Sequence, residues 1–251
     1  MSTSPDESDE VRAFAASLPE SYRRNFDIVA IAAHTKIARE RESASANVGS
    51  FNSSRVPGSA VCVVADDRPG LLALVTDALL VHGLVIRHAQ AFCRKRGDGQ
   101  SEAVDFFRLQ QARSGTGSSA LDVDASELGA FLQTLSDLVA EDIVASTRIS
   151  NAPVRTGIVC RVYFELEALR RDEYLLLVEA ADSDGLLHAI TSALHAQGVR
   201  ILSCEIGTEG GVARDRFELA SPEGGPLSAE RLCDIQQAVF TAVPVVRGSR
   251  H

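Results

Sequence analysis

One pattern of strand, turn, helix and hairpin occurs twice in this chain of 251 residues, and the repeat constrains the fold more than any other sequence feature. The glycine of the turn and the glycine after the helix both recur at the same spacing. Gly185 follows Gly70, and Gly198 follows Gly83, each by 115 residues. Two landmarks repeated in register indicate an internal duplication.

Each copy has the same order of predicted elements. In the first copy, a buried strand (AVCVVA) precedes the turn DDRPG, an apolar helix that ends at Gly83, and a hairpin around KRGDGQSE. A second helix is predicted over DASELGAFLQTLSDLVAED. The second hairpin is shorter, so Asp215 corresponds to Asp105 at a spacing of 110 residues.

This order predicts an α+β fold with two tandem ferredoxin-like βαββαβ modules and antiparallel sheets. The closing strand of the first module is expected at residues 142–149 or 158–164. The second module has only residues 243–246, interrupted by Pro244, as its own last strand. Either one of the two strands between the repeats completes it, or another subunit does.

The segments outside the repeat complete the predicted domain organisation. We expect residues 1–10 to be disordered, 11–42 to be helical, and the Ser-, Asn- and Gly-rich residues 43–58 to form a linker. The first module then covers residues 59–166 and the second covers 173–246.

The charge of the chain limits its partners and its location. Its 34 acidic and 25 basic residues give a net charge of −9, which disfavours binding to nucleic acid or to an anionic membrane. No apolar run approaches the roughly 20 residues that span a bilayer, and the acidic N-terminus differs from a signal peptide. We expect a cytoplasmic protein.

The cysteine and histidine patterns predict no metal site and no cofactor. The five cysteines are scattered and form no CxxC pair, which favours buried free thiols in a reducing compartment. The six histidines form no HxxxH or HD pair. We expect His88 and His188 to lie on helix or strand surfaces.

The segment from Asp67 to Gly83 resembles the ACT domain, whose family binds amino acids at or near the turn between the first strand and the first helix. Over residues 18–243, the chain resembles the C-terminal regulatory region of the bifunctional enzymes that uridylylate and deuridylylate the PII nitrogen-signalling protein. Three features carry this resemblance: Tyr22 followed twelve positions later by His34, VCRVYFELEA leading into YLLLVEAADSDGLL, and the ending GGPLSAERLCDIQQAV.

The catalytic motifs of those enzymes are absent from the sequence. Nucleotidyl transfer in that family needs a Gly-Ser loop with paired acidic metal ligands, and hydrolysis needs an HD-type cluster. Neither pattern occurs here. We therefore expect a regulatory protein and not an enzyme.

The first turn is the stronger candidate for an amino-acid site. A helix N-terminus offers free N–H groups and partial positive charge to a ligand carboxylate. Pro69 suits the first helical turn, and Gly70 leaves the backbone accessible. Asp67 caps the helix or accepts a hydrogen bond from a ligand ammonium, and Arg68 covers the mouth. The candidate ligand-binding residues are Asp67, Arg68, Pro69, Gly70, Leu71 and Leu72.

The second turn is expected to bind more weakly. Its residues are Asp182, Ser183, Asp184 and Gly185. Asp184 stands where the first turn has Pro69 and would repel a ligand carboxylate, and Ser183 is expected to be a plain N-cap. Glu205 and Asp215 are further candidates to approach a ligand across the sheet, but nothing local separates them from ordinary exposed acids.

These observations predict a sensor for a small amino acid, with glutamine favoured because of the resemblance. Binding at a module or subunit interface would change how the modules associate, and a homodimer or a regulatory protein partner would respond. The alternative is a ligand-independent dimerisation or docking module for a nucleotidyltransferase or a transcriptional regulator.

Overall fold

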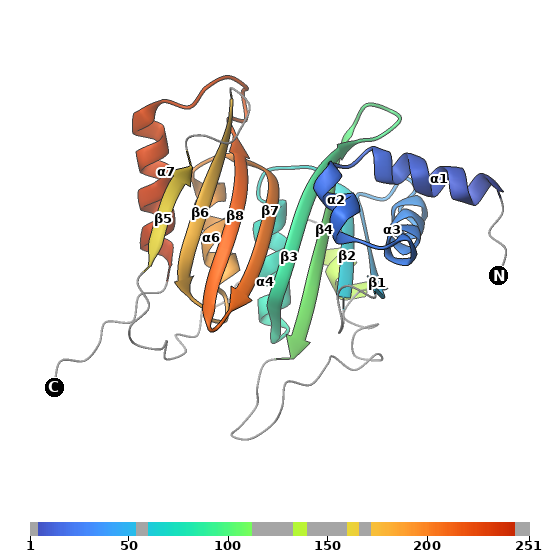
Figure 1. Ribbon diagram of the computed structural model, residues 1–251, viewed down its shortest axis with the longest axis horizontal. Coiled ribbons are helices and arrows are strands. Elements are labelled where there is room, and N and C mark those ends of the chain that lie inside the picture. The colour runs from blue at the N-terminus through green and yellow to red at the C-terminus, as the bar shows by residue number, and fades with distance from the viewer. Residues whose placement is uncertain (1–4, 54–59, 112–132, 140–159, 166–171, 244–251) are drawn as a thin grey trace. The chain divides into compact units, whose positions relative to one another are not determined.

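The structure is a computed structural model that describes residues 5–53, 60–111, 133–139, 160–165 and 172–243 (Figure 1). The chain divides into two compact units. The first contains residues 1–67 and 91–143, and the second contains residues 68–90 and 144–251. Strand β3 (Leu84–Lys95) is divided between them, with its first seven residues in the second unit. Each unit combines helices with antiparallel strands, in agreement with the predicted α+β class.

The first unit has a central antiparallel sheet in the order β1-β2-β4. Its strands are β1 (Ala46–Phe51), β2 (Ala60–Asp66) and β4 (Ser101–Gln111). Residues 60–65 of β2 are all buried, as the continuous apolar run AVCVVA predicts. The hairpin that leads into β4 is closed by the Arg96 N–H, which donates to the Gln100 carbonyl at 2.9 Å, so the turn expected at KRGDGQSE is confirmed.

Three helices cover the sheet of the first unit: α1 (Pro5–Ala16), α2 (Glu20–Asn25) and α3 (Ile28–Glu40). Their apolar side chains join Cys62, Val64 and Phe106 of the strands in one core cluster. At its centre the Tyr22 hydroxyl lies 2.9 Å from His34 Nδ1. Burial raises the pKa of Tyr22 and lowers the pKa of His34 to about 3, so both members of this buried pair are neutral.

Two predictions for the N-terminal region are wrong in part. Helix α1 begins at Pro5, inside the segment expected to be disordered, because Val11 and Phe14 anchor it in the core cluster. Strand β1 lies inside the segment expected to be a linker, where its backbone pairs with β2 and Phe51 is buried. The predicted helical segment 11–42 is helical but is broken before α2 and before α3.

The second unit has an antiparallel sheet in the order β7-β8-β6-β5. The strands are β5 (Arg161–Glu165), β6 (Glu173–Ala181), β7 (Arg200–Glu209) and β8 (Val212–Ala220). Helices α6 (Leu186–Ala196) and α7 (Ala229–Ala242) lie behind this sheet in Figure 1, both on the same side. Helix α4 (Leu71–Val81) belongs to this unit and packs against α6.

Strand β5 occupies the edge position that the sequence left open. It pairs with β6 from Arg161↔Glu179 to Glu165↔Leu175, so a strand between the repeats completes the second sheet. Val243 is the C-cap of α7, and the rest of the alternative last strand lies outside the described residues, as does the candidate strand at 142–149. Strands β1 and β5 begin 115 residues apart, so the repeat includes this edge strand.

The compact units differ from the modules predicted at 59–166 and 173–246. Helix α4 comes from the first sequence repeat, but its contacts place it with the second unit because it packs against α6, its counterpart 115 residues later. Both candidate turns, at residues 67–70 and 182–185, therefore lie in the second unit, except for Asp67.

Candidate functional site

The two turns that precede α4 and α6 have nearly identical backbones. The N-cap of α4 is Gly70 with φ 82°, and the N-cap of α6 is Gly185 with φ 83°. A left-handed residue at this position favours glycine, because a Cβ would clash with the backbone. Neither cap residue has a side-chain hydrogen bond, and both helices continue with two leucines. The first N–H of each helix donates to a backbone carbonyl of its own turn, from Leu71 to Arg68 at 3.3 Å and from Leu186 to Ser183 at 3.1 Å, so no side chain caps it.

Three local predictions for these turns are corrected by the cap geometry. Ser183 was expected to cap its helix, and capping was one of the two roles expected for Asp67, but a glycine is the N-cap in both. Pro69 lies before the first turn of α4 and not within it. The reason is the left-handed glycine, which moves the start of each helix past the residues predicted to cap it.

The first turn is covered by a histidine from the other repeat. The ring of His195 on α6 lies so close to Gly70 that a Cβ there would be 2.8 Å from its Cε1 atom. Leu71 and Leu72 are buried at the start of α4, while Pro69 is exposed. The Asp67 N–H donates to the Ser101 carbonyl at 3.1 Å in the first unit.

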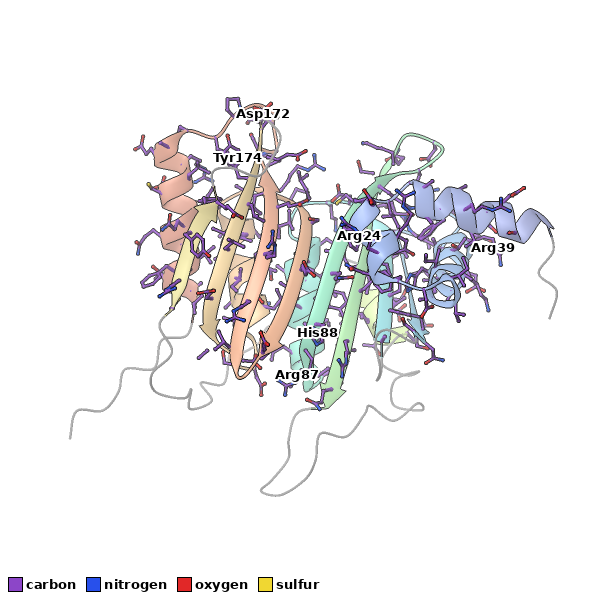
Figure 2. The ribbon with its side chains drawn as sticks, viewed as in Figure 1. Arg24, Arg39, Arg87, His88, Asp172 and Tyr174 are labelled. Carbon is purple, nitrogen blue, oxygen red and sulfur yellow. The ribbon has the colours of Figure 1, made fainter. Side chains whose placement is uncertain are left out.

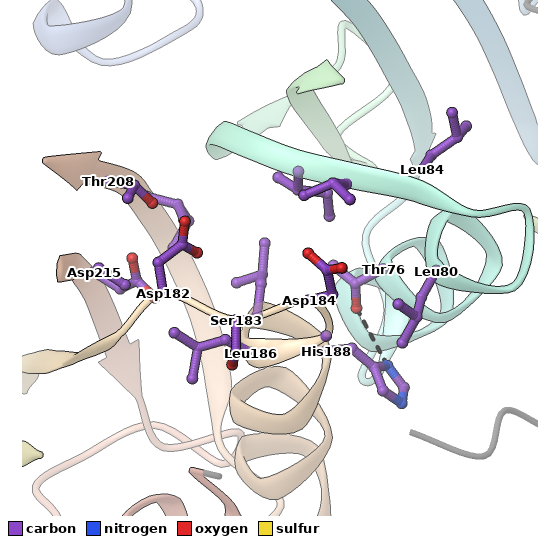
Figure 3. A pocket seen from close by; sticks show the side chains of 16 residues that line it. Thr76, Leu80, Leu84, Asp182, Ser183, Asp184, Leu186, His188, Thr208 and Asp215 are labelled. Atoms are coloured by element: carbon purple, nitrogen blue, oxygen red, sulfur yellow. Dashed lines mark hydrogen bonds between the residues drawn. The ribbon is translucent and has the colours of Figure 1, made fainter. Parts of the chain in front are cut away.

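The second turn lines a pocket, shown in Figure 3. All four candidate residues of this turn contribute, together with the first turn of α6. The remaining walls come from α4, the first half of β3, and strands β7 and β8, through Thr76, Leu80, Leu84, Val85, Ile86, Ile206, Thr208, Ala213 and Asp215. The cavity volume is about 40 Å³, enough for a few water molecules or for the polar head of a small ligand.

Asp215 is the most unusual residue of the pocket wall. It is 1% exposed, and neither carboxylate oxygen makes a hydrogen bond with the described residues. Burial raises the pKa of Asp215 to about 7, the neighbouring Gly207 N–H partly offsets this, and the Asp182 charge adds to it. The Gly207 N–H does not reach hydrogen-bond geometry. Asp215 is therefore a buried acid on the pocket wall, near the Gly207 N–H but without a hydrogen bond of normal geometry to the described residues.

Asp182 differs from Asp215 because a cation neutralises it. Arg87 Nη1 donates to Asp182 Oδ2 at 3.1 Å. Arg87 and its neighbour His88 lie on the half of β3 that belongs to the second unit (Figure 2). His88 is exposed on this strand, as predicted. Asp184, which is exposed, and Asp215 are the acids of the pocket that have no cationic partner among the described residues.

Helices α4 and α6 meet at equivalent positions of the two repeats. Thr76 Oγ1 lies 3.1 Å from Thr191 Oγ1, its counterpart 115 residues later. His188 Nδ1 lies 3.4 Å from the carbonyl of Ala73, also 115 residues away. Contact between a residue and its own counterpart is the property of a two-fold axis, so the helix pair has local two-fold symmetry. His188 lies on α6 as predicted, is partly exposed, and takes part in this helix contact.

The burial of Asp215 was not predicted, although the sequence contains a signal for it. The side chains of β8 alternate, and Ala213, Asp215, Phe217 and Leu219 are the buried ones. An acid in the inward phase of a strand is uncommon, and the same position is acidic in the first repeat, at Asp105. Alternation and duplication together could have separated Asp215 from exposed acids.

The described residues contain no group of three or more histidine, cysteine or acidic side chains that could hold a metal ion. Their helices also include none of the length and apolar character needed to cross a membrane. None of the five cysteines, all of which are among the described residues, forms a disulfide bond. Cys62 and Cys204 are buried as predicted, whereas Cys233 is exposed.

The chain has weak similarity to one curated enzyme. No protein-family model matches the sequence. The bifunctional uridylyltransferase/uridylyl-removing enzyme of Streptomyces coelicolor is 26% identical over 188 residues, which are 72% of this chain and 22% of that protein. The chain thus spans about a fifth of the length of that relative.

Among solved structures, an unknown protein from Galdieria sulphuraria is 18% identical. The match covers 71% of this chain and 89% of that chain, with a TM-score of 0.23. A score this low does not establish a common fold.

Proposed function

We propose that this chain is a non-catalytic regulatory protein that senses a small amino acid, with glutamine favoured, in nitrogen or amino-acid regulation. Each repeat would be an ACT-type ferredoxin-like module in which the preceding edge strand takes the place of the last strand. The single observation that carries the proposal is the pocket at the start of α6, whose walls come from both sequence repeats.

The composition of the walls connects binding to regulation. Thr76 and Leu80 come from the first repeat, and the turn at Asp182–Gly185 comes from the second. A ligand that contacts both parts favours the arrangement in which they are together, and this preference is what changes an equilibrium between arrangements. A pocket confined to one repeat would give no such coupling.

The chemistry of the pocket suits a zwitterion. The start of α6 offers backbone N–H groups to a carboxylate, and Ser183 Oγ is buried there without a hydrogen-bond partner among the described residues. Asp215 offers a carboxylate to an ammonium group. Because the pocket lies at the second turn, we propose this turn as the main amino-acid site, in place of the Asp67–Leu72 segment that the sequence favoured.

A thermal-shift screen of the twenty amino acids against the full chain tests the proposal. Calorimetry is the follow-up, because the chain has no tryptophan to report binding. A ligand at one hundred times its dissociation constant adds about 2.7 kcal/mol to the stability of the state that binds it. Selective stabilisation by one or a few amino acids is expected. No stabilisation by any of them would contradict the proposal.

Ligand-independent dimerisation is the second candidate, and two exposed side chains favour it. Tyr163 on the edge strand β5 is 42% exposed, and Phe240 on α7 is 43% exposed. A second copy of the chain could bury both. Sedimentation of wild type and Phe240→Asp, with and without glutamine, separates the candidates. A dimer that Phe240→Asp disrupts and that glutamine does not affect would favour this alternative.

The proposal includes no catalytic activity. It rests on the absence from the sequence of the Gly-Ser loop with paired acids and of the HD-type cluster. Incubation with a PII-type protein, UTP and magnesium should give no transfer of uridylyl groups. Detectable transfer would contradict this part of the proposal.

A further inference from the structure

Two polar side chains in the pocket at the start of α6 have no hydrogen-bond partner among the described residues. They are the carboxylate of Asp215 and the hydroxyl of Ser183. Figure 3 shows Asp215 on the strand side of the pocket and Ser183 at the start of α6. Burying a polar group without a partner costs free energy, and native structures rarely leave such groups unsatisfied. The arrangement leaves both groups in need of a partner from outside the described residues, and a bound ligand would supply one.

The partner of Asp215 must bring a donor, because an ionised carboxylate only accepts hydrogen bonds. Among the described residues, Arg87 donates to Asp182 and not to Asp215. Asp182 still raises the pKa of Asp215 in spite of its ion pair with Arg87, and the carboxylate of Asp184 lines the same pocket, so the potential there is negative. This potential favours a cation over a neutral donor.

The size and lining of the pocket limit which cation fits. Much of the wall is apolar, through Leu80, Leu84, Val85, Ile86, Ile206 and Leu186. A bare metal ion would find too few oxygen ligands, because the described residues provide no cluster of three ligating side chains. A primary ammonium group needs fewer partners than a metal ion, because it has only three N–H donors. The carbon to which it is attached can be covered by the apolar wall.

We propose that Asp215 binds the ammonium group of the ligand, so that the pocket selects compounds with a primary amine and rejects the same compounds without it. This inference rests on the proposed function and deepens it, because it names the group of the amino acid that is recognised. Asp184 repels a carboxylate near the helix start, and therefore the amine contributes more to binding than the carboxylate does.

The first repeat provides a matched control. Asp105 corresponds to Asp215, is 3% exposed, and burial raises its pKa to about 8. It does not line the pocket at the start of α6. Asp105→Asn and Asp215→Asn therefore make the same chemical change at equivalent buried positions, and only the second change removes the ammonium acceptor.

The experiment is calorimetry on the full chain at pH 8 with three related compounds. They are glutamine, glutaramate (glutamine without its amino group) and 4-aminobutanamide (glutamine without its carboxylate). The corresponding set for alanine is alanine, propionate and ethylamine. We expect the amino acid to bind best, the amine to bind more weakly, and the deaminated acid to give no detectable heat. Asp215→Asn should weaken binding at least tenfold, and Asp105→Asn should change it less than twofold.

Three results would overturn the inference: a deaminated acid that binds as tightly as its amino acid, undiminished affinity in Asp215→Asn, or no detectable binding of any amine in the panel. The compound comparison uses the wild-type chain, so it does not depend on the folding of a variant.

The outcomes also separate this inference from the proposed function. If amino acids bind and Asp215→Asn binds them equally well, the sensor remains and the role of Asp215 fails. If amines bind as tightly as amino acids and Asp215→Asn loses both, the role of Asp215 remains and amino-acid sensing fails.

Discussion

The turn before α4 and the turn before α6 share a backbone and differ in the side chain that faces the glycine. His195 lies against Gly70. The counterpart of His195 in the first repeat, 115 residues earlier, is Leu80, and Leu80 lines the pocket with Gly185. A duplicated turn thus has a covered form and an open form. In our proposal, the residue of the other repeat that lies against the glycine decides which turn binds a ligand, and the sequence of the turn itself does not.

The largest expected effect concerns the two buried acids, Asp105 and Asp215. Their pKa values are raised to about 8 and about 7 from an ordinary value of 3.8. Between pH 4 and these values the folded state keeps a proton that the unfolded state has lost, so the free energy of unfolding falls as pH rises. Asp105→Asn removes this loss and should stabilise the chain by several kcal/mol at pH 9 and little at pH 4.

Urea unfolding at pH 4, 6, 8 and 9 measures this effect for both asparagine variants. The stabilisation relative to wild type should keep increasing up to a higher pH in Asp105→Asn than in Asp215→Asn. An unchanged pH dependence in both variants would show that these carboxyls titrate normally.

The next effect concerns the glycines themselves. Valine at either position is strained by the positive φ, and at Gly70 it also meets the His195 ring. Both variants should lose stability. Only Gly185→Val should lose amino-acid binding, by at least a hundredfold or about 2.7 kcal/mol. Calorimetry below the melting temperature of each variant measures this, and loss of binding only in Gly70→Val would reverse the order of the two turns.

Exchange of the covering side chains sharpens the comparison further. Leu80→His places a histidine beside the turn at Gly185, as His195 lies beside the turn at Gly70. It should weaken amino-acid binding about tenfold, or about 1.4 kcal/mol. His195→Leu is the matched change at the first turn and should leave binding at the second turn unchanged. If Leu80→His binds like wild type, the covering side chain does not account for the difference between the turns.

The smallest expected effect concerns the contact on the local two-fold axis. Thr76→Val and Thr191→Val each remove one hydroxyl of the 3.1 Å pair and should cost about 1 kcal/mol. The double variant should cost less than the two single variants together, because both remove the same interaction. Denaturant melts of the four proteins measure the coupling. Strict additivity would mean that the two hydroxyls do not interact in solution.

The internal repeat was the part of the fold that the sequence predicted best. Glycines at 70, 83, 185 and 198 fix the turns and helix ends because all four have positive φ. Strand β1 was missed because its Ser, Asn and Gly residues resemble a linker, and its pairing with β2 depends on contacts distant in sequence. The same strand explains why no last strand is needed at residues 243–246, since its counterpart β5 closes the second sheet.

Only half of the candidate site could be predicted from the sequence. The turn Asp182–Gly185 was found from its pattern, but its importance relative to the first turn depends on His195 and Leu80, which approach from a helix of the other repeat. No local pattern contains that information. Asp215 could have been found, because it is in the buried phase of β8 and has an acidic counterpart in the first repeat.

A crystal structure of the full chain grown with glutamine tests the central claim most directly. The account predicts the ligand in the pocket at the start of α6, with its amino group on Asp215 and its carboxylate toward Ser183 and the first N–H groups of the helix. Ligand at the Gly70 turn instead, or a pocket filled by the chain's own side chains in the presence of saturating glutamine, would contradict it.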